Sequence, residues 1–468
     1  MSERRTRTFA YAYLLNIAGK LADIVYFVLL VGAMSKSQLG LVNTLLAASA
    51  FAYLFVDLGL VQASLRHYSR QLEAPARLLR GGLSYRLLIF IVLMVLSALV
   101  PLHDSSSSLI FTALGYQLAS FFTAYSMSWL RGGHRQTIAN LLVCTESVLR
   151  LVLLWLVLRS FETISAQHLL LGLLFVKLVF MLISVVKVYR YSQHMEASSA
   201  ACGKGVFLVA GQATFFSISL ITVIQNRVDW LLVSYWGGLA KTADYSVANR
   251  LYEIVLFILG IGFSTMYPWL CRLGQGPDKT IADARGLTLA QYALLACSPI
   301  VVAVTLAIFP LINKFVWSGE YLESIAFLKI LMPCVVISTA NILLYHQLLA
   351  ANSERAVFKV SVIATILQVM VNIFLIRKMG GSGAVAGMWV LNTINLALYA
   401  YLVARAGGSI ITSASLFIIP LSVSVVMYIS YQYLDVFLAG GIWIVLSICL
   451  LLGVLQRNRS FSKTVNTA

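Results

Sequence analysis

Long apolar segments alternate with short polar connections along the whole chain. Each segment reaches about 20 residues or more, the length an α-helix needs to cross the ~30 Å hydrocarbon core of a bilayer. Hydropathy therefore predicts fourteen membrane-spanning helices. The predicted spans cover residues 9–31, 39–62, 83–102, 108–130, 139–159, 165–187, 206–236, 243–271, 286–309, 323–350, 356–376, 382–404, 411–432 and 437–456.

Composition agrees with an all-α polytopic membrane protein. Of the 468 residues, 60% are hydrophobic and only 11% are charged, and the mean hydropathy is +0.88. A soluble protein of this length could not solvate such a surface. The N-terminal MSERRTRTFAYAY is a short basic arm that leads into a full-length apolar segment, which predicts a retained first span. The short connections leave no room for a soluble catalytic domain.

The basic residues predict the orientation in the membrane. With the N-terminus inside, most of the 34 Lys and Arg residues fall in cytoplasmic connections and both termini are cytoplasmic. The outward connections hold Lys36, Arg159, Lys241, Lys314, Arg377 and Lys378. The formal charge of +17 is therefore mainly a topology signal. It does not indicate a nucleic-acid partner, although the basic cluster at 66–86 could contact anionic lipid headgroups.

The two halves of the chain resemble each other. The segment from Gln38 to Arg70 has a counterpart from Ala243 to Arg272, and residues 129–156 match the pattern of 348–376. Each half then holds six helices, which predicts a parallel repeat around a central cavity, as in transporters. We expect an N-terminal lobe at 1–200, a C-terminal lobe at 201–404, and two further helices with a cytoplasmic tail at 405–468. Chance similarity between apolar helices is the alternative.

Ionisable residues within the predicted spans are the main candidate functional groups, because charge in hydrocarbon is costly. The basic ones are Lys20, Arg150, Lys177, Arg227, Arg250 and Lys329, and the acids are Asp23, Asp57, Glu146, Asp229 and Glu253. Three local pairs follow from helical spacing: Lys20 with Asp23, Glu146 with Arg150, and Arg250 with Glu253. For these, a self-neutralised pair facing the bundle interior competes with a functional role.

Two basic residues have no acid suitably placed on their own helix. Arg227 and Asp229 are two positions apart, about 200° around a helix, so they cannot face each other. No acid lies within one turn of Lys177. We expect Arg227 and Lys177 to line a wet cavity, with a buried interhelical pair as the alternative. Lys329, near the outer end of its span, is expected to snorkel.

Polar and aromatic residues accompany these charges. Asn16 shares a face with Lys20 and Asp23; Asn226 shares one with Asp229. Tyr245, Asn249 and Tyr252 form a face of the span at 243–271. Such faces suit sugar hydroxyls, but they suit interhelical contacts equally well. For Asp57 we favour a structural role, in which it balances the charge of Arg66 and Arg70 near the inner end of its span.

An interior richer in basic than in acidic residues suits an anionic passenger, because a desolvated phosphate needs cationic donors. A cation antiporter would instead be expected to show unpaired carboxylates. The balance favours a phosphate-bearing substrate.

Several segments resemble one known family. DWLLVSYWGGLAKTADYSVANRLYEI, VDLGLVQASLR, LLAANSERAVFKV and VNIFLIRKMGGSGAVAGMWVL are similar to polysaccharide exporters. These are the oligosaccharide-lipid flippases (Wzx type) of the MATE-like MOP exporter superfamily, and the resemblance covers roughly residues 9–404. It implies two lobes that open alternately to the two sides of a bacterial cytoplasmic membrane. It also implies transfer of undecaprenyl-diphosphate-linked oligosaccharide to the outer leaflet.

The resemblance also implies roles for particular residues. In relatives, basic residues on the first, second, seventh and eighth spans engage the diphosphate, and this chain offers Lys20, Arg227 and Arg250. The second span has no basic residue before Arg66, which departs from the lipid II flippase pattern and favours O-antigen, capsule or exopolysaccharide units. We further assign Arg150, Lys177, Asn16, Asn226, Asn249, Tyr245 and Tyr252 to substrate binding. The acids Asp23, Asp57, Glu146, Asp229 and Glu253 are assigned to ion coupling or structure.

No enzymatic activity, cofactor or metal site is expected. The expected partners are the lipid-linked substrate and membrane lipids, while an H⁺ or Na⁺ counter-ion and contact with a polysaccharide polymerase and its chain-length machinery stay open. The alternatives are a MATE-type drug or cation antiporter and a lipid II flippase. A membrane polymerase or ligase would need a sizeable outward loop, an ABC flippase would need GxxxxGK[ST], and neither is present. A non-transporting scaffold would leave Arg227 and Lys177 without a purpose.

Overall fold

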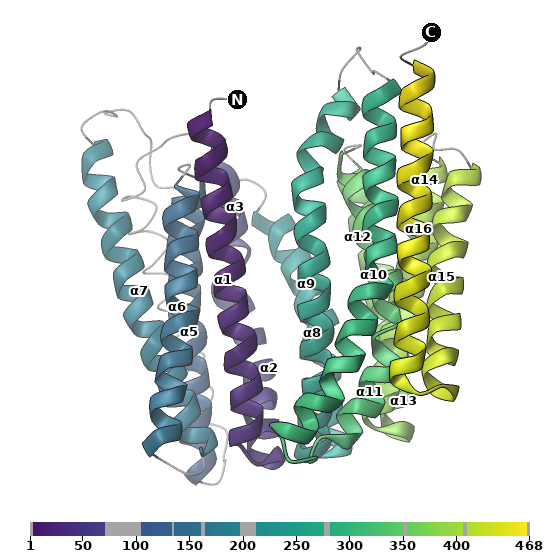
Figure 1. Ribbon diagram of the computed structural model, residues 1–468. Coiled ribbons are helices and arrows are strands. Elements are labelled where there is room, and N and C mark those ends of the chain that lie inside the picture. The colour runs from purple at the N-terminus through teal and green to yellow at the C-terminus, as the bar shows by residue number, and fades with distance from the viewer. Residues whose placement is uncertain are drawn as a thin grey trace. The chain divides into compact units, whose positions relative to one another are not determined.

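Every element that the structure describes is an α-helix (Figure 1). The computed structural model describes residues 3–70, 104–132, 135–160, 164–196, 212–275, 281–350, 353–405 and 410–465. Helices suit these apolar sequences, because a helix satisfies its own backbone hydrogen bonds where no water is present. The predicted all-α polytopic fold is confirmed.

Fifteen helices lie within the residues that the structure describes. In chain order they are α1 (Glu3–Ala33), α2 (Lys36–Asp57), α3 (Leu60–Arg70), α5 (Asp104–Gly132), α6 (Gln136–Ser160), α7 (Ala166–Glu196), α8 (Gln212–Gly237), α9 (Leu239–Gln275), α10 (Ile281–Phe315), α11 (Leu322–Leu331), α12 (Cys334–Ala350), α13 (Glu354–Met379), α14 (Gly381–Arg405), α15 (Ile410–Tyr433) and α16 (Val436–Val465).

Thirteen of the fourteen predicted spans fall on these helices, although the start of one of them, 206–211, lies outside the described residues. The remaining span, 83–102, lies outside them entirely. Within the described ranges, eight helices are long and apolar enough to cross a membrane, or nine if α11 and α12 form one bent span. The chain is therefore a multi-pass membrane protein.

The chain divides into two compact units, Met1–Leu231 and Leu232–Ala468. In the first unit α1 packs along α6, α5 packs along α7, and α2 and α3 pack against α5. Its core includes Phe121, Tyr125, Leu130, Val176 and Phe180. In the second unit α13 packs along α14, α10 along α16, and α12 lies against α9 and α14. The predicted lobe boundaries at 200 and 404 stay a prediction.

Two spans that hydropathy treats as single helices are broken. The first breaks between α2 and α3, where Leu58 and Gly59 have positive φ angles of 45° and 77°. Asp57 bridges this break: its carboxylate accepts the backbone N–H groups of Gly59 and Val61 at 3.2 and 2.9 Å. The second breaks before Cys334, and α11 and α12 are bent by 46°.

Small residues allow close helix contact at two places. A Cβ atom on Gly19 of α1 would lie 3.0 Å from the Cα atom of Cys144 of α6, so the two backbones nearly touch there. On α14, Gly383 lies against the backbone of Leu375 and Gly387 lies against the side chain of Asn372. Both contacts match the general use of small residues where membrane helices approach closely.

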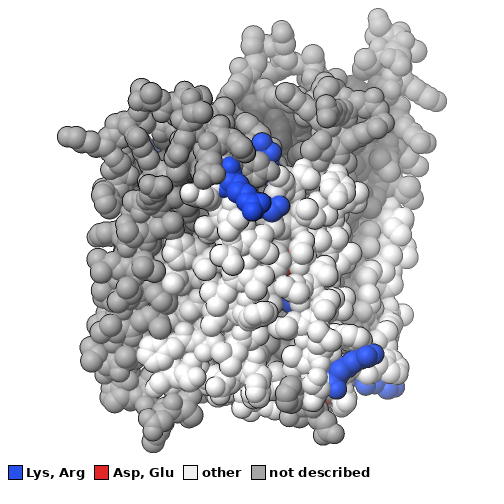
Figure 2. All heavy atoms as spheres, turned by 90° about the vertical axis from the view of Figure 1, so that its left-hand side faces the viewer, with Lys and Arg blue, Asp and Glu red and all other residues white. Residues whose placement is uncertain are grey.

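Charge is distributed by depth on the described part of the surface in Figure 2. Lys and Arg atoms gather at two levels, and the broad band between them is almost entirely uncharged apart from small blue and red spots. Such a band is expected where the surface faces hydrocarbon. On this face, few charged groups of the described residues reach the surface between the two levels.

Candidate functional site

Five charged side chains of the first unit come together within three apolar spans. Asp23 lies in the apolar span Leu14–Ala33 and is about 15 Å from either end of that span at 1.5 Å per residue. Arg150 lies near the centre of the span Gln136–Ser160, and Lys177 near the centre of Ala166–Arg190. These residues belong to α1, α6 and α7, so three helices contribute to one cluster.

The cluster is a continuous chain of ion pairs. Lys20 Nζ lies 3.8 Å from Asp23 Oδ2, and Arg150 Nη2 lies 3.3 Å from Asp23 Oδ1. Arg150 Nη2 is also 3.5 Å from Glu146 Oε1, and Lys177 Nζ is 2.7 Å from the same oxygen. The order is Lys20, Asp23, Arg150, Glu146, Lys177, in which bases and acids alternate. With three bases and two acids, the network has a formal net charge of +1.

Exposure is greatest at the Lys20 end of this network and smallest at Glu146. The exposed fractions of the side chains are 5% for Glu146, 15% for Lys177, 21% for Arg150, 30% for Asp23 and 44% for Lys20. Glu146 and Lys177 are therefore largely enclosed by helix packing, whereas the Lys20 end is accessible. A lysine this exposed at mid-membrane depth is expected to face a water-filled space and not lipid.

Close packing of α1 on α6 places the two halves of the network within reach. Gly19 contacts Cys144, and both helices then continue in the same direction for one to two turns to Asp23 and to Arg150. A larger residue at position 19 would push the helices apart. The sequence predicted Lys20–Asp23 and Glu146–Arg150 as local pairs, and both are confirmed.

Lys177 is paired, although its own helix offers no nearby acid. Its partner is Glu146 of α6, and this is the interhelical pair that the sequence had left as the alternative. The contact with Glu146 therefore favours that alternative over the expected wet cavity for Lys177. Hydropathy and helical spacing cannot reveal a contact between residues on different helices.

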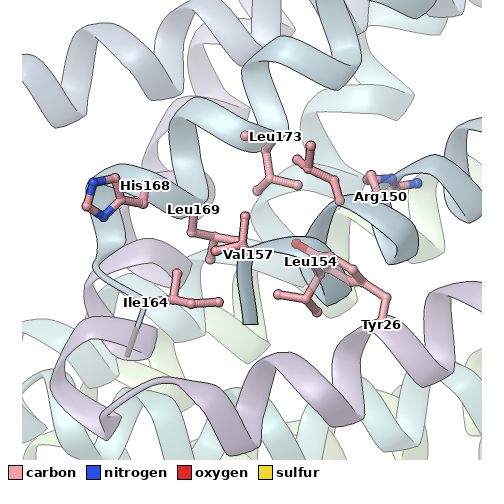
Figure 3. Close-up of a pocket in the computed structure, with 10 residues that line it drawn as sticks. Tyr26, Arg150, Leu154, Val157, Ile164, His168, Leu169 and Leu173 are labelled. Atoms are coloured by element: carbon pink, nitrogen blue, oxygen red, sulfur yellow. The ribbon is translucent and has the colours of Figure 1, made fainter. Parts of the chain in front are cut away.

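A small cavity of about 40 Å³ lies between α1, α6 and α7 beside Arg150 (Figure 3). Leu154, Val157 and Leu169 line it between Arg150 on one side and His168 on the other. His168 Nδ1 is 2.9 Å from Ser165 Oγ. The cavity is far below the roughly 300 Å³ of typical ligand pockets and its lining is mostly apolar. The ion-pair network, and not this cavity, is therefore the candidate site.

Tyr26 is a neighbour of the network that the sequence analysis missed. It lines the same cavity as Arg150 and follows Asp23 by three residues on α1. That spacing places it on the face that holds Lys20 and Asp23. The signal was therefore present in the sequence. Asn16, from the same face, is half-buried.

The second unit holds a smaller charged group on α9. Arg250 Nη1 lies 3.1 Å from Glu253 Oε2, which confirms the third predicted pair. Asn249 donates from Nδ2 to Glu253 Oε1 at 3.4 Å, and its side chain is buried. Arg250 and Glu253 are 40% and 34% exposed. This pair is therefore accessible in the same manner as Lys20 and Asp23.

The two predicted tyrosines of α9 lie in the core of the second unit. Tyr245 is fully buried. The Tyr252 hydroxyl is 2.5 Å from Ser338 Oγ on α12 and accepts a hydrogen bond from Asn392 Nδ2 on α14 at 3.4 Å. Tyr252 therefore makes interhelical contacts, which the sequence analysis had left open as the alternative to sugar binding.

The charged residues of α8 both contact Trp230. Asp229 is buried and its Oδ1 accepts the backbone N–H of Trp230 at 2.9 Å. The Arg227 guanidinium lies 4.9 Å from the centre of the Trp230 ring. Asn226 is exposed and donates to the backbone carbonyl of Thr222. Asp57, the remaining predicted acid, caps α3 as described above.

In the part of the chain that the structure describes, no group of three or more His, Cys, Asp or Glu side chains could hold a metal ion. What the first unit offers is a set of cationic donors from three helices, held by two carboxylates. Guanidinium and ammonium groups of this kind bind phosphate and carboxylate groups.

Comparison with known proteins gives one family match and several similar folds. A family model described as "Polysaccharide biosynthesis protein" matches residues 6–273. The structure of the lipid II flippase MurJ in an inward closed conformation has a TM-score of 0.68 at 15% identity, covering 98% of this chain and 99% of that chain. None of the curated proteins compared with the chain matches it.

Two multidrug transporter structures share the fold over a shorter range. An inward-facing MATE family transporter of the MOP superfamily has a TM-score of 0.57 at 12% identity, covering 84% of this chain and 94% of that chain. The MATE multidrug transporter DinF-BH gives 0.57 at 13% identity, covering 85% of this chain and 95% of that chain. The fold is therefore one that flippases and transporters share.

Proposed function

The chain belongs to the polysaccharide biosynthesis protein family, and we propose that it is a Wzx-type flippase. Its substrates are undecaprenyl-diphosphate-linked oligosaccharide repeat units of O-antigen, capsule or exopolysaccharide. The protein carries them from the inner to the outer leaflet by alternating access. The polyprenyl tail stays in lipid while the charged headgroup and glycan pass through the protein.

The observation that carries this proposal is the net positive ion-pair network in the first unit. A diphosphate that leaves water loses its hydration and needs cationic donors in exchange. Lys20 and Arg150 are the most accessible cations of the network, and Lys177 is more deeply buried. In the proposal Arg227 and Arg250 provide further cationic contacts, and Asn16 and Asn226 donate to glycan hydroxyls.

The remaining parts of the proposal concern the setting. The protein lies in a bacterial cytoplasmic membrane with both termini in the cytoplasm, as the distribution of basic residues predicts. Its halves are pseudo-symmetric lobes at 1–200 and 201–404, followed by two additional helices. Membrane lipids are partners. Whether transport is coupled to H⁺ or Na⁺ stays open, and Asp23, Asp229 and Glu253 are the candidate carriers.

An accumulation assay in cells tests the function. Bacteria that lack this protein should accumulate lipid-linked repeat units on the inner leaflet, and the wild-type gene should restore export. A variant with Lys20→Ala, Arg150→Ala and Arg227→Ala should fail to restore export although it reaches the membrane. Normal export by that variant would contradict the cationic binding site.

Reconstitution in vesicles separates this proposal from its rivals. The purified protein should flip a fluorescent polyprenyl-diphosphate oligosaccharide, and a matched lipid without the diphosphate should not move. Lipid II flipping is the second candidate, because the MurJ fold extends over 98% of the chain. Preferential movement of lipid II would establish it. Transport of an amphipathic cation such as ethidium in place of these lipids would instead identify an antiporter.

A further inference from the structure

The two carboxylates of the ion-pair network hold their cations in different ways. Glu146 is 5% exposed, and one of its oxygens contacts both Lys177 and Arg150. Asp23 is 30% exposed, and it contacts Lys20 with one oxygen and Arg150 with the other. Glu146 is thus enclosed by helix packing, whereas Asp23 lies at the accessible side of the network.

Asp23 occupies the position in which an anionic ligand would meet the network. A single carboxylate reaches Lys20 on its own helix and Arg150 on α6, so both cationic groups converge on one point. Phosphate and carboxylate oxygens are interchangeable ligands for a guanidinium group. An entering phosphate could therefore form the same contacts after Asp23 has moved aside.

Removing either acid has a different electrostatic consequence. Without Glu146, Lys177 and Arg150, whose side chains are 15% and 21% exposed, would have no counter-charge between them, which is costly. Without Asp23, Lys20 and Arg150 lose one partner in a place that water reaches. Asp23 is consequently the acid that the network can release at the lower cost.

We propose that Asp23 is an internal counter-anion that holds Lys20 and Arg150 in the empty protein and is displaced by the diphosphate of the substrate. This deepens the proposed function by naming the residue that substrate must displace. Before binding, Asp23 keeps the network near neutrality at a depth where excess charge is unfavourable. After binding, the diphosphate neutralises the same cations, and the return of Asp23 promotes release.

Two isosteric variants test this inference. Asp23→Asn and Glu146→Gln each raise the net charge of the network by one, but only Asp23→Asn removes the group that competes with the ligand. Binding is measured by calorimetry on the full chain in detergent, with inorganic pyrophosphate and with farnesyl diphosphate, a short polyprenyl diphosphate. We expect Asp23→Asn to bind both probes about tenfold more tightly or better, and Glu146→Gln to gain much less.

A transport measurement adds a second readout. Because return of Asp23 promotes release, Asp23→Asn should flip the glycolipid more slowly than the wild type although it binds more tightly. A residue with a merely structural role would not combine tighter binding with slower transport. Asp23→Glu keeps the negative charge and should restore affinity towards that of the wild type.

The outcomes separate this inference from the proposed function. Wild-type flipping together with unchanged or weaker probe binding by folded Asp23→Asn overturns the inference and leaves the flippase function standing. A wild-type protein that neither binds farnesyl diphosphate nor flips glycolipid overturns the function itself. Tighter binding of pyrophosphate without tighter binding of farnesyl diphosphate would assign the site to a free anion and overturn the role in lipid recognition.

A measurement on the wild type covers the case in which Asp23→Asn does not fold. Pyrophosphate should change the carboxylate bands of the infrared spectrum, because one carboxylate leaves two ion pairs. The change should be absent when phosphate-free salt of equal ionic strength is added. Identical spectra in the presence and absence of bound pyrophosphate would overturn the inference.

Discussion

At the residue scale, Glu146 is the group on which the buried end of the network depends. Glu146 forms an ion pair with Lys177, and it shares Arg150 with Asp23. Glu146→Gln leaves two largely buried cations without this charge, at a cost of about 3–5 kcal/mol. Lys177→Gln leaves Glu146 still paired with Arg150 and should cost less. Thermal unfolding in detergent should rank Glu146→Gln below Lys177→Gln, and equal stabilities would contradict the shared-partner geometry.

Asp57 provides a residue-scale test between structure and ion coupling. Its carboxylate caps α3 through Gly59 and Val61, so Asp57→Ala should lower the free energy of unfolding by about 1 kcal/mol. Asp57→Asn keeps one acceptor oxygen and should lose less. In a flipping assay Asp57→Asn should retain the wild-type response to H⁺ and Na⁺ gradients. Loss of that response in both variants alike would identify Asp57 as an ion carrier.

Sequence reasoning was limited by contacts between helices. Helical spacing was sufficient for Lys20 with Asp23, because both lie on one helix and share a face. It could not give Lys177 its partner, since Glu146 lies on another helix and the pairing depends on how α6 packs on α7. The same applies to Tyr252, whose hydroxyl contacts α12 and α14. The face formed by Tyr245, Asn249 and Tyr252 fits sugar binding and buried interhelical contacts equally well.

At the element scale, the tight contact between α13 and α14 depends on glycine. A Cβ atom at position 383 would overlap the backbone of Leu375, and one at 387 would overlap Asn372 Oδ1. Gly383→Ala and Gly387→Ala should each reduce stability by about 1–3 kcal/mol through overpacking. Gly260 of α9 has no atom within 4 Å of the equivalent position. Gly260→Ala is therefore the matched control.

That control should be neutral or stabilising, because alanine favours a helix by up to about 1 kcal/mol over glycine. The measurement is again thermal unfolding in detergent, with expression level as a second readout. If Gly260→Ala were as harmful as Gly383→Ala, helix packing would not explain the effect.

Hydropathy located the helices well but not their breaks. The spans predicted at 39–62 and 323–350 are each two helices. Average hydropathy continues across Asp57–Gly59 and across Pro333, because the flanking residues on both sides are apolar. The local signals were nevertheless present: Asp57 two residues before Gly59, and Pro333, which has no backbone N–H. Such residues report backbone geometry, which an apolar average does not contain.

At the scale of the whole molecule, the long apolar helices favour the membrane, whereas the charges buried among them are unfavourable there. The apolar surfaces keep the protein in lipid, whereas each buried charge adds an energetic cost that must be offset by partners. The ion-pair network of the first unit offsets it with alternating acids and bases and retains a net charge of +1. A small residual charge lets the membrane potential act on the empty and on the loaded protein with opposite sign.

This opposition leads to a prediction about driving force. An inside-negative potential favours outward movement of an anionic headgroup by roughly 2.3 kcal/mol per charge per 100 mV, and it draws the empty cationic site back inward. In vesicles with uniformly oriented protein, a potassium diffusion potential of this sign should accelerate flipping, and the reversed potential should slow it. The rate is followed by access of an external lectin to the glycan. Equal rates at both polarities, together with acceleration by a proton or sodium gradient at zero potential, would assign the driving force to ion exchange, with Asp229 and Glu253 as the carriers to substitute next.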